Sequence, residues 1–118
     1  MLRSKALAVW LLLAPLAAQT ITWHQLTPSA SPPARGNAAM AYHGAIQRCV
    51  LFGGGPRGTG ATFGDTWVWN GTTWADVTPI VSPPPRAFAG MAEDPVRLRV
   101  ILFGGRLANG NAVNDTWA

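Results

Sequence analysis

Short hydrophobic runs separated by polar and glycine-rich segments follow one another along the chain, and the stretch from Arg48 to Trp74 shows this pattern best. Val50–Phe52 is apolar, β-branched and aromatic and ends at a pair of glycines, which is typical of a buried strand. Further on, Trp67 and Trp69 alternate with smaller residues, so both indoles are expected on one face of a sheet. The dipeptide Asn70-Gly71 offers the positive φ angles of a hairpin turn. The pattern predicts antiparallel strands.

The same pattern recurs 51 residues further along the chain. Residues 23–54 align with residues 74–105, and 15 of these 32 positions are identical. The matches include Trp23 with Trp74, Arg35 with Arg86, Met40 with Met91, Arg48 with Arg99, and Leu51–Gly54 with Leu102–Gly105. After the loss of one residue in a loop, Asp65-Thr66-Trp67 matches Asp115-Thr116-Trp117. A repeat of about 50 residues with a glycine pair and a later tryptophan predicts a propeller architecture.

These motifs resemble the Kelch repeat, in the form found in many bacterial exported proteins and in the central domain of galactose oxidase-like proteins. The shared features are Pro-x-Arg, a small-residue strand with Met, Leu-Phe-Gly-Gly, Asp-Thr-Trp-x-Trp and Asn-Gly-Thr-Thr-Trp, and they cover almost everything after residue 22. The resemblance implies an all-β fold of Kelch-type β-propeller blades, each of four antiparallel strands, in an incomplete propeller of about two repeats. The structural motif residues are Gly53, Gly54, Asp65, Trp67, Trp74, Gly104, Gly105, Asp115 and Trp117.

The repeat divides the chain into expected units. Residues 19–26 form an edge strand, residues 35–77 form blade one and residues 86–118 form an incomplete blade two. The expected strands of these blades are 37–42, 48–53, 65–70, 73–77, 88–93, 97–103 and 114–118. Proline-rich connections precede each blade, because proline cannot donate a hydrogen bond to a sheet. Closure of the propeller then requires further Kelch repeats or self-association of the chain.

The N-terminal segment 1–18 has the outline of a secretory signal peptide. Arg3 and Lys5 precede an apolar run from Ala6 to Ala18, and this run is shorter than the about 20 residues that cross a bilayer. We therefore predict export to the periplasm or the extracellular space, with a mature chain that begins near Gln19, in preference to a stable membrane anchor. An uncleaved anchor is the alternative interpretation.

Charge and cysteine content exclude some classes of function. The formal net charge of +4 falls to +2 without Arg3 and Lys5, and the remaining arginines form no cluster, so nucleic-acid binding has no support. Cys49 is the single cysteine and takes the place of Val100 in the repeat. We interpret it as a buried thiol that replaces valine, with catalytic or intermolecular disulfide use as the alternative.

Five residues are candidates for ligand binding. Arg35 and Arg86 follow prolines, and the resemblance places them near one propeller face, where they either bond backbone carbonyls of the blade or contact a ligand. In relatives a common glycine stands where this chain has Asn37 and Phe88. The polar loops 55–63 and 106–113 are the expected binding surface, because recognition residues gather on loops of a rigid scaffold. They supply the other three candidates, Arg57, Arg106 and Asn109.

No set of residues in the sequence predicts catalysis, a metal site or a cofactor. Asp65 and Asp115 open their strands and are expected to accept hydrogen bonds from turn amides, as aspartate does before strands. No second carboxylate lies at ligand spacing, so the sequence does not favour metal binding at either aspartate. Galactose oxidase chemistry requires two tyrosines, and Tyr42 is the only one. The leading hypothesis is an exported, noncatalytic module that binds a protein or glycan. The alternative is an N-terminal fragment of a carbohydrate-acting propeller enzyme, similar to galactose oxidase or to a sugar-acid isomerase.

Overall fold

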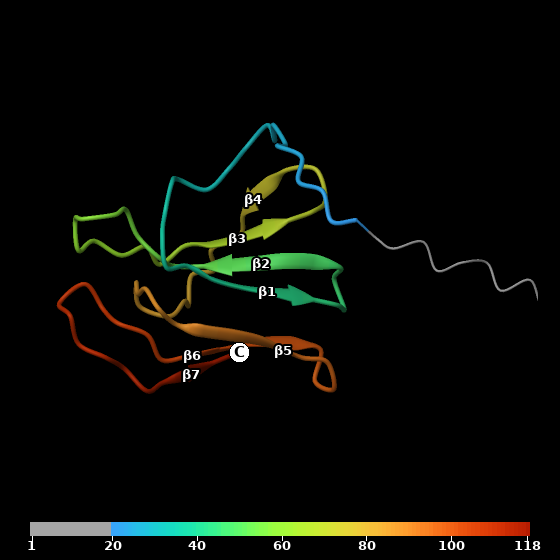
Figure 1. The fold of residues 1–118 in the computed structure, drawn as a ribbon. Helices are drawn as coiled ribbons and strands as arrows, with labels where there is room; N and C mark the ends of the chain where they lie inside the picture. Colours follow the sequence, from blue (N-terminus) through green and yellow to red (C-terminus); the bar gives the residue numbers. More distant parts are fainter. Residues whose placement is uncertain (1–19) are drawn as a thin grey trace, which may run out of the picture.

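The computed structural model describes residues 20–118, and its regular structure is antiparallel β-sheet (Figure 1). Seven strands form: β1 (Ala39–His43), β2 (Arg48–Phe52), β3 (Thr66–Trp69), β4 (Trp74–Asp76), β5 (Gly90–Asp94), β6 (Arg99–Phe103) and β7 (Thr116–Trp117). They build a first sheet in the order β1-β2-β3-β4 and a second sheet in the order β5-β6-β7. No helix occurs between residues 20 and 118, so the all-β prediction is confirmed.

The register of the strands divides the side chains of each sheet between two faces. In the first sheet one face carries Ala39, Ala41, Val50, Phe52, Thr66 and Val68. The opposite face, which we call the free face, carries Met40, Tyr42, Cys49, Leu51, Trp67, Trp69 and Trp74. The expectation that Trp67 and Trp69 share a face agrees with this register, and the ring of Trp69 lies 5.5 Å from that of Trp74 between centroids.

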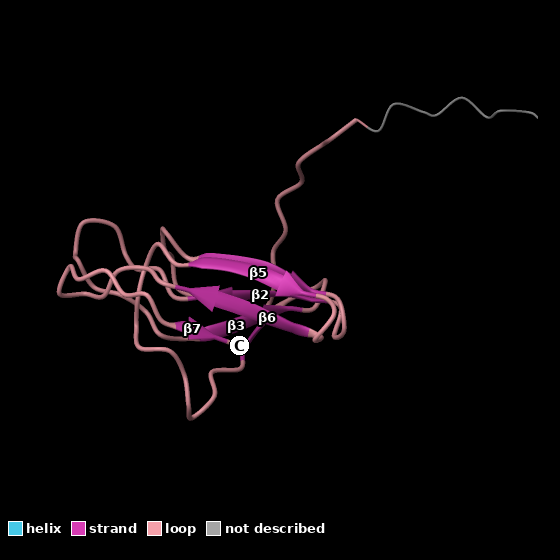
Figure 2. Ribbon diagram, turned by 90° about the horizontal axis from the view of Figure 1, so that it is seen from below, coloured by secondary structure: helices cyan, strands magenta, loops and turns pink. Residues whose placement is uncertain are grey.

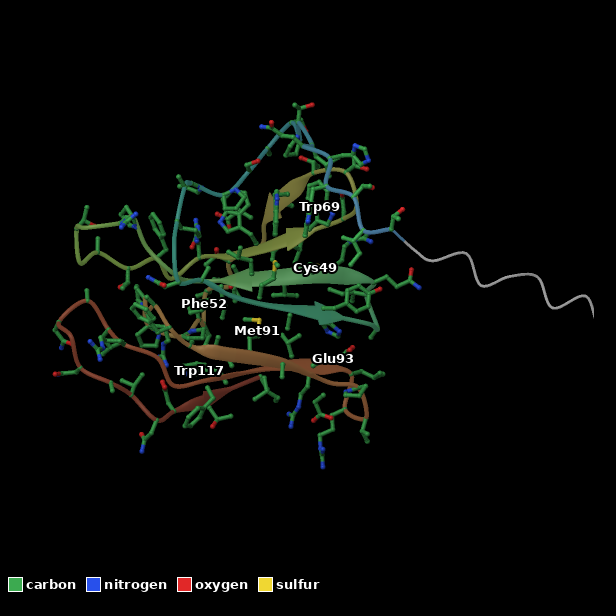
Figure 3. The ribbon with its side chains drawn as sticks, viewed as in Figure 1. Cys49, Phe52, Trp69, Met91, Glu93 and Trp117 are labelled. Atoms are coloured by element: carbon green, nitrogen blue, oxygen red, sulfur yellow. The ribbon has the colours of Figure 1, made fainter. Side chains whose placement is uncertain are left out.

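The core lies between the two sheets, where β1 packs against β5 (Figure 1). Phe52 and Ala39 from the first sheet pack with Leu102 from the second, and Met91 and Trp117 cover them from the side (Figure 3). All five are apolar, so their burial stabilises the pair of sheets by the hydrophobic effect. The opposite side of the second sheet, its outer face, carries Gly90, Ala92, Ile101, Phe103 and Thr116.

The hairpin after β3 differs from the one that the sequence predicts. Only Gly71 has a positive φ, of 99°, whereas Asn70 acts through its side chain. Its Oδ1 accepts hydrogen bonds from the backbone N–H groups of Thr72 and Thr73, both at 2.9 Å. An asparagine side chain that bonds the backbone two residues ahead forms a turn of its own, so a second positive φ is not needed.

The segment predicted as an edge strand is not in a sheet, because residues 20–28 pair with no strand in the described part of the chain. Trp23 is almost fully exposed in consequence. A strand needs a partner for its backbone groups, and no strand in the described part of the chain supplies one to residues 20–28. The remaining strands lie where the sequence places them, shortened or shifted by one to three residues. The predicted signal segment 1–18 lies outside the described residues.

Candidate ligand-binding cleft

The two loops predicted to form a binding surface lie side by side at one end of both sheets (Figures 1 and 2). A cleft of about 490 Å³ lies between them. Its lining is mostly backbone and small side chains, with the larger side chains of Asn37, Arg57, Phe88, Arg106 and Leu107. The backbone of Gly36 pairs with Gly55, and that of Ala87 pairs with Arg106, so the base of each loop is fixed to its sheet.

Two strained backbone positions line the cleft. Asn37 and Phe88 occupy equivalent places in the repeat and have φ angles of 56° and 62°. Phe88 N–H donates a hydrogen bond of 3.0 Å to the carbonyl of Asn37, so the two positions are joined across the sheets. A bulky residue such as phenylalanine rarely adopts this conformation, and strained backbone concentrates at functional sites. The geometry also explains why a glycine suits this position.

The cleft carries unbalanced positive charge. Arg57 and Arg106 are exposed, and neither guanidinium has a carboxylate or hydrogen-bond partner among residues 20–118. The two aspartates at this end of the sheets, Asp65 and Asp115, are already paired with other arginines. The mouth of the cleft therefore offers two free guanidinium groups to a ligand.

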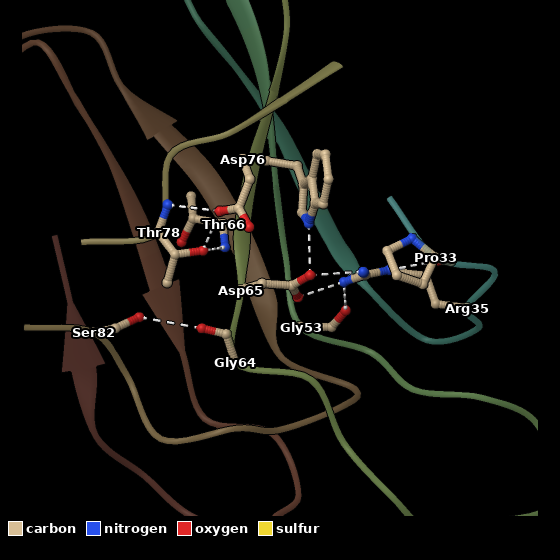
Figure 4. Close-up of polar contacts among 10 residues, drawn as sticks. Pro33, Arg35, Gly53, Gly64, Asp65, Thr66, Asp76, Thr78 and Ser82 are labelled. Carbon is tan, nitrogen blue, oxygen red and sulfur yellow. Dashed lines mark hydrogen bonds and ion pairs between the residues drawn. The ribbon is translucent and has the colours of Figure 1, made fainter. Parts of the chain in front are cut away.

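Arg35 does not line the cleft but ties its own unit together (Figure 4). Its guanidinium donates to both carboxylate oxygens of Asp65, at 2.6 and 2.7 Å, and to the carbonyl of Gly53 at 2.9 Å. The carbon centre of the guanidinium lies 4.3 Å from the centroid of the Phe63 ring. We call this pair of side chains an Arg–Asp bracket, because it joins the segment before β1 to the start of β3.

The second unit repeats the bracket with Arg86 and Asp115. The guanidinium donates to both carboxylate oxygens and, at 2.9 Å, to the carbonyl of Gly104, and the side chain of Arg86 is only 1% exposed. Bonding of backbone carbonyls was one of the two roles expected of these arginines, and both make such bonds. The aspartate partners were not predicted, although an aspartate recurs 30 residues after Arg35 and 29 residues after Arg86.

Both bracket carboxyls are held in the ionised form. Partial burial opposes ionisation of Asp65, but hydrogen bonds from Arg35 and Trp67, together with the charge of Arg35, outweigh it and lower the pKa of this carboxyl. Hydrogen bonds from Arg86 and Trp117 hold the pKa of Asp115 far below its ordinary value. The expected bonds from turn amides are thus replaced by bonds from guanidinium and indole groups.

The other sequence candidates have local roles. Asn109 lies outside the cleft lining, and its side chain accepts a hydrogen bond of 3.0 Å from Asn111 N–H, which shapes the loop. Thr62 lines the cleft, and its buried hydroxyl has no partner in the described chain. Cys49 is half-buried on the free face, so the prediction of a buried thiol is corrected; its repeat equivalent Val100 is also half-buried, so the thiol occupies a valine-like position that is not fully buried.

Within residues 20–118, no group of three or more histidine, cysteine, aspartate or glutamate side chains converges as a metal site. Nor does any helix of that part of the chain have the length and apolar character to cross a membrane.

Comparison with known proteins supports the fold alone. No protein-family model matches the chain, and no curated protein matches it significantly. Among solved structures, the chain is similar to one titled "Structure of YjhT", with a TM-score of 0.63 and 18% sequence identity. The similarity covers 85% of this chain and 32% of the other, so the chain spans about a third of the length of that structure.

Proposed function

We propose that the chain is a Kelch-type, noncatalytic recognition module that binds a protein or glycan in the cleft between loops 55–63 and 106–113. The observation that carries the proposal is the pair of unpaired guanidinium groups, Arg57 and Arg106, at the mouth of a cleft lined by strained backbone. Arginine donates several hydrogen bonds in a fixed plane to oxygen acceptors, which glycans and protein carboxylates both supply.

The four-stranded first sheet and the matching order of the second support the interpretation of the repeats as propeller blades, the second one incomplete. Loops at one end of such a scaffold are held by the sheets while their side chains remain free to vary. The predicted signal peptide supports export of this module from the cytoplasm, to a compartment where glycans and surface proteins are accessible. Mass spectrometry of the protein from producing cells tests export, since recovery of intact Met1 in the cytoplasm would contradict it.

The binding proposal is tested by screening the protein against a glycan array and then measuring the affinity of a hit by calorimetry. Arg57→Ala and Arg106→Ala should each weaken binding about tenfold or more, because each removes a charged hydrogen-bond donor worth roughly 1.5–3 kcal/mol. Arg97→Ala is the matched control, since it removes the same charge from an exposed hairpin turn at the other end of the second sheet. Equal affinity in all three variants would contradict the assignment of the cleft.

An N-terminal fragment of a carbohydrate-acting enzyme is the alternative proposal, and the partial coverage of a longer similar structure supports the fragment part of it. In that case the catalytic residues belong to repeats outside this sequence. Turnover in an oxidase and isomerase assay panel by a longer product of the same reading frame, absent from residues 1–118 alone, would replace the binding proposal.

A further inference from the structure

The groups that join the two sheets within one chain have equivalents that could join two chains in the same way. Three backbone hydrogen bonds cross from the first unit to the second, and we call them the seam. Gly54 N–H donates to Arg86 O at 2.9 Å, Phe88 N–H donates to Asn37 O at 3.0 Å, and Arg86 N–H donates to Phe63 O at 3.2 Å. Side chains of Phe52, Ala39, Met91 and Leu102 pack beside them.

The 51-residue repeat gives each hydrogen-bonding atom of the seam an equivalent atom in the other unit. Each of these equivalent atoms lies on a side of the molecule that faces no other sheet. Beside the second sheet these equivalents are Gly105 N–H, Phe88 O and Val113 O, and beside the first sheet they are Arg35 O, Asn37 N–H and Arg35 N–H. None of these six groups has a hydrogen-bond partner among residues 20–118. Unpaired backbone groups of this kind recruit another chain.

The side chains around these groups match in the same way. The repeat matches the first-sheet residues that face the second sheet with residues of the outer face. The matched pairs are Ala41 with Ala92, Val50 with Ile101, Phe52 with Phe103, and Thr66 with Thr116. The free face offers Met40, Leu51 and Trp67 where the second sheet has the packed residues Met91, Leu102 and Trp117. The buried and unburied members differ greatly in exposure, since Phe52 is 3% exposed and Phe103 is 55% exposed.

A pair of cavities shows what covers the free face. Between the sheets, Pro79, Met91 and Val100 line a cavity of about 160 Å³ together with Val50, Phe52 and Thr66 of the first sheet. On the free face, the equivalent residues Pro28, Met40 and Cys49 line a larger cleft of about 410 Å³. The free-face cleft lacks the side that Val50, Phe52 and Thr66 supply between the sheets. The repeat equivalents of these three residues are Ile101, Phe103 and Thr116, on the outer face of the second sheet.

We infer that the occupant of the free face is the outer face of a second copy of this chain, docked head to tail through a repeat of the seam. Gly105 N–H and Val113 O of one copy then bond Arg35 O and Arg35 N–H of the next, and Asn37 N–H of the next copy bonds Phe88 O. One bond between the sheets is not repeated: Gly44 N–H donates to Glu93, whereas the equivalents are Pro95, which lacks an N–H group, and Tyr42. The contact between copies is therefore weaker than the contact within one chain.

The test uses one substitution on each face, Met40→Asp and Phe103→Asp, in the chain expressed with its own N-terminal segment. Both side chains are exposed, so the charges affect association more than folding. The wild-type mass, measured by light scattering, should rise with concentration, and each variant alone should remain a monomer. An equimolar mixture should form a one-to-one pair and nothing larger, because each variant keeps the face that the other has lost.

Val96→Asp is the control, since it places the same charge on an exposed hairpin turn and should associate like the wild type. Circular dichroism checks each variant, and the milder pair Met40→Ser and Phe103→Ser replaces any variant that loses the wild-type spectrum. Self-association of the Phe103 variant alone would show a free-face to free-face dimer and overturn the head-to-tail arrangement. A wild type that stays monomeric would overturn the inference and assign these faces to a different protein.

Discussion

The two repeats contain the same Arg–Asp bracket in different surroundings. Arg35 closes its own unit, and its backbone N–H and carbonyl have no partners in the described chain. Arg86 closes its unit in the same way, but its backbone groups also bond the first unit, through Gly54 and Phe63. The arginine at this repeat position therefore has two structural roles: its side chain closes its own unit, and its backbone can bond the neighbouring unit. Arg86 has both roles in the described chain, and Arg35 has only the first.

Removal of a bracket carboxylate should produce the largest loss of stability, and the loss should differ between the two units. Asp65→Ala is expected to lower the free energy of unfolding by about 3 kcal/mol, the lower end of the range for breaking a buried ion pair. The loss is at the lower end because the Arg35 guanidinium still packs on the Phe63 ring. Asp115→Ala should lower Tm further, since Arg86 is more deeply buried and the repeat has Val113 in place of the Phe63 ring. Thermal unfolding followed by circular dichroism measures both. Equal losses would show that burial of the arginine does not matter.

The glycine pair gives the next contrast. Gly53 and Gly104 both have positive φ angles, of 68° and 65°, so alanine costs about 1–2 kcal/mol at either position. At Gly53 a Cβ would also lie 2.4 Å from Arg86 O, whereas at Gly104 its nearest neighbour is Val113 O at 3.1 Å. Gly53→Ala should therefore lower Tm at least twice as much as Gly104→Ala. The reverse order would place the seam elsewhere.

Acid should weaken both brackets together, with a smaller effect on Tm. Because both carboxyls have pKa values below the ordinary value of about 3.9, their stabilisation is complete above about pH 5 and is lost as the pH falls through the lowered values. Tm should be constant from neutral pH to about pH 5 and fall below about pH 4. The double variant with Asp65→Asn and Asp115→Asn should have a flatter profile. An unchanged slope in that variant would assign the acid response to other carboxyls.

The sequence pattern predicts most of the fold, because alternation, glycine pairs and the 51-residue repeat are local signals. It fails at residues 20–26, where a strand depends on a partner outside the repeat, and at Asn70, where a side-chain hydrogen bond replaces a backbone angle. At the candidate site, loop composition predicted Arg57 and Arg106 as binding residues; both line the cleft, and their role in binding stays a prediction. The brackets and the seam were not predicted, because a pairing across 30 residues is decided by packing and not by local pattern.

The central claim is that the seam within the chain is repeated between chains, and hydrogen exchange at two glycine amides tests it most directly. Gly54 N–H, bonded to Arg86 O, should exchange slowly at every protein concentration. Its equivalent, Gly105 N–H, should exchange rapidly in dilute solution and become protected as the mass of the complex rises, and Phe103→Asp should abolish that protection. Rapid exchange of Gly105 N–H in a sample that is fully associated would contradict the claim.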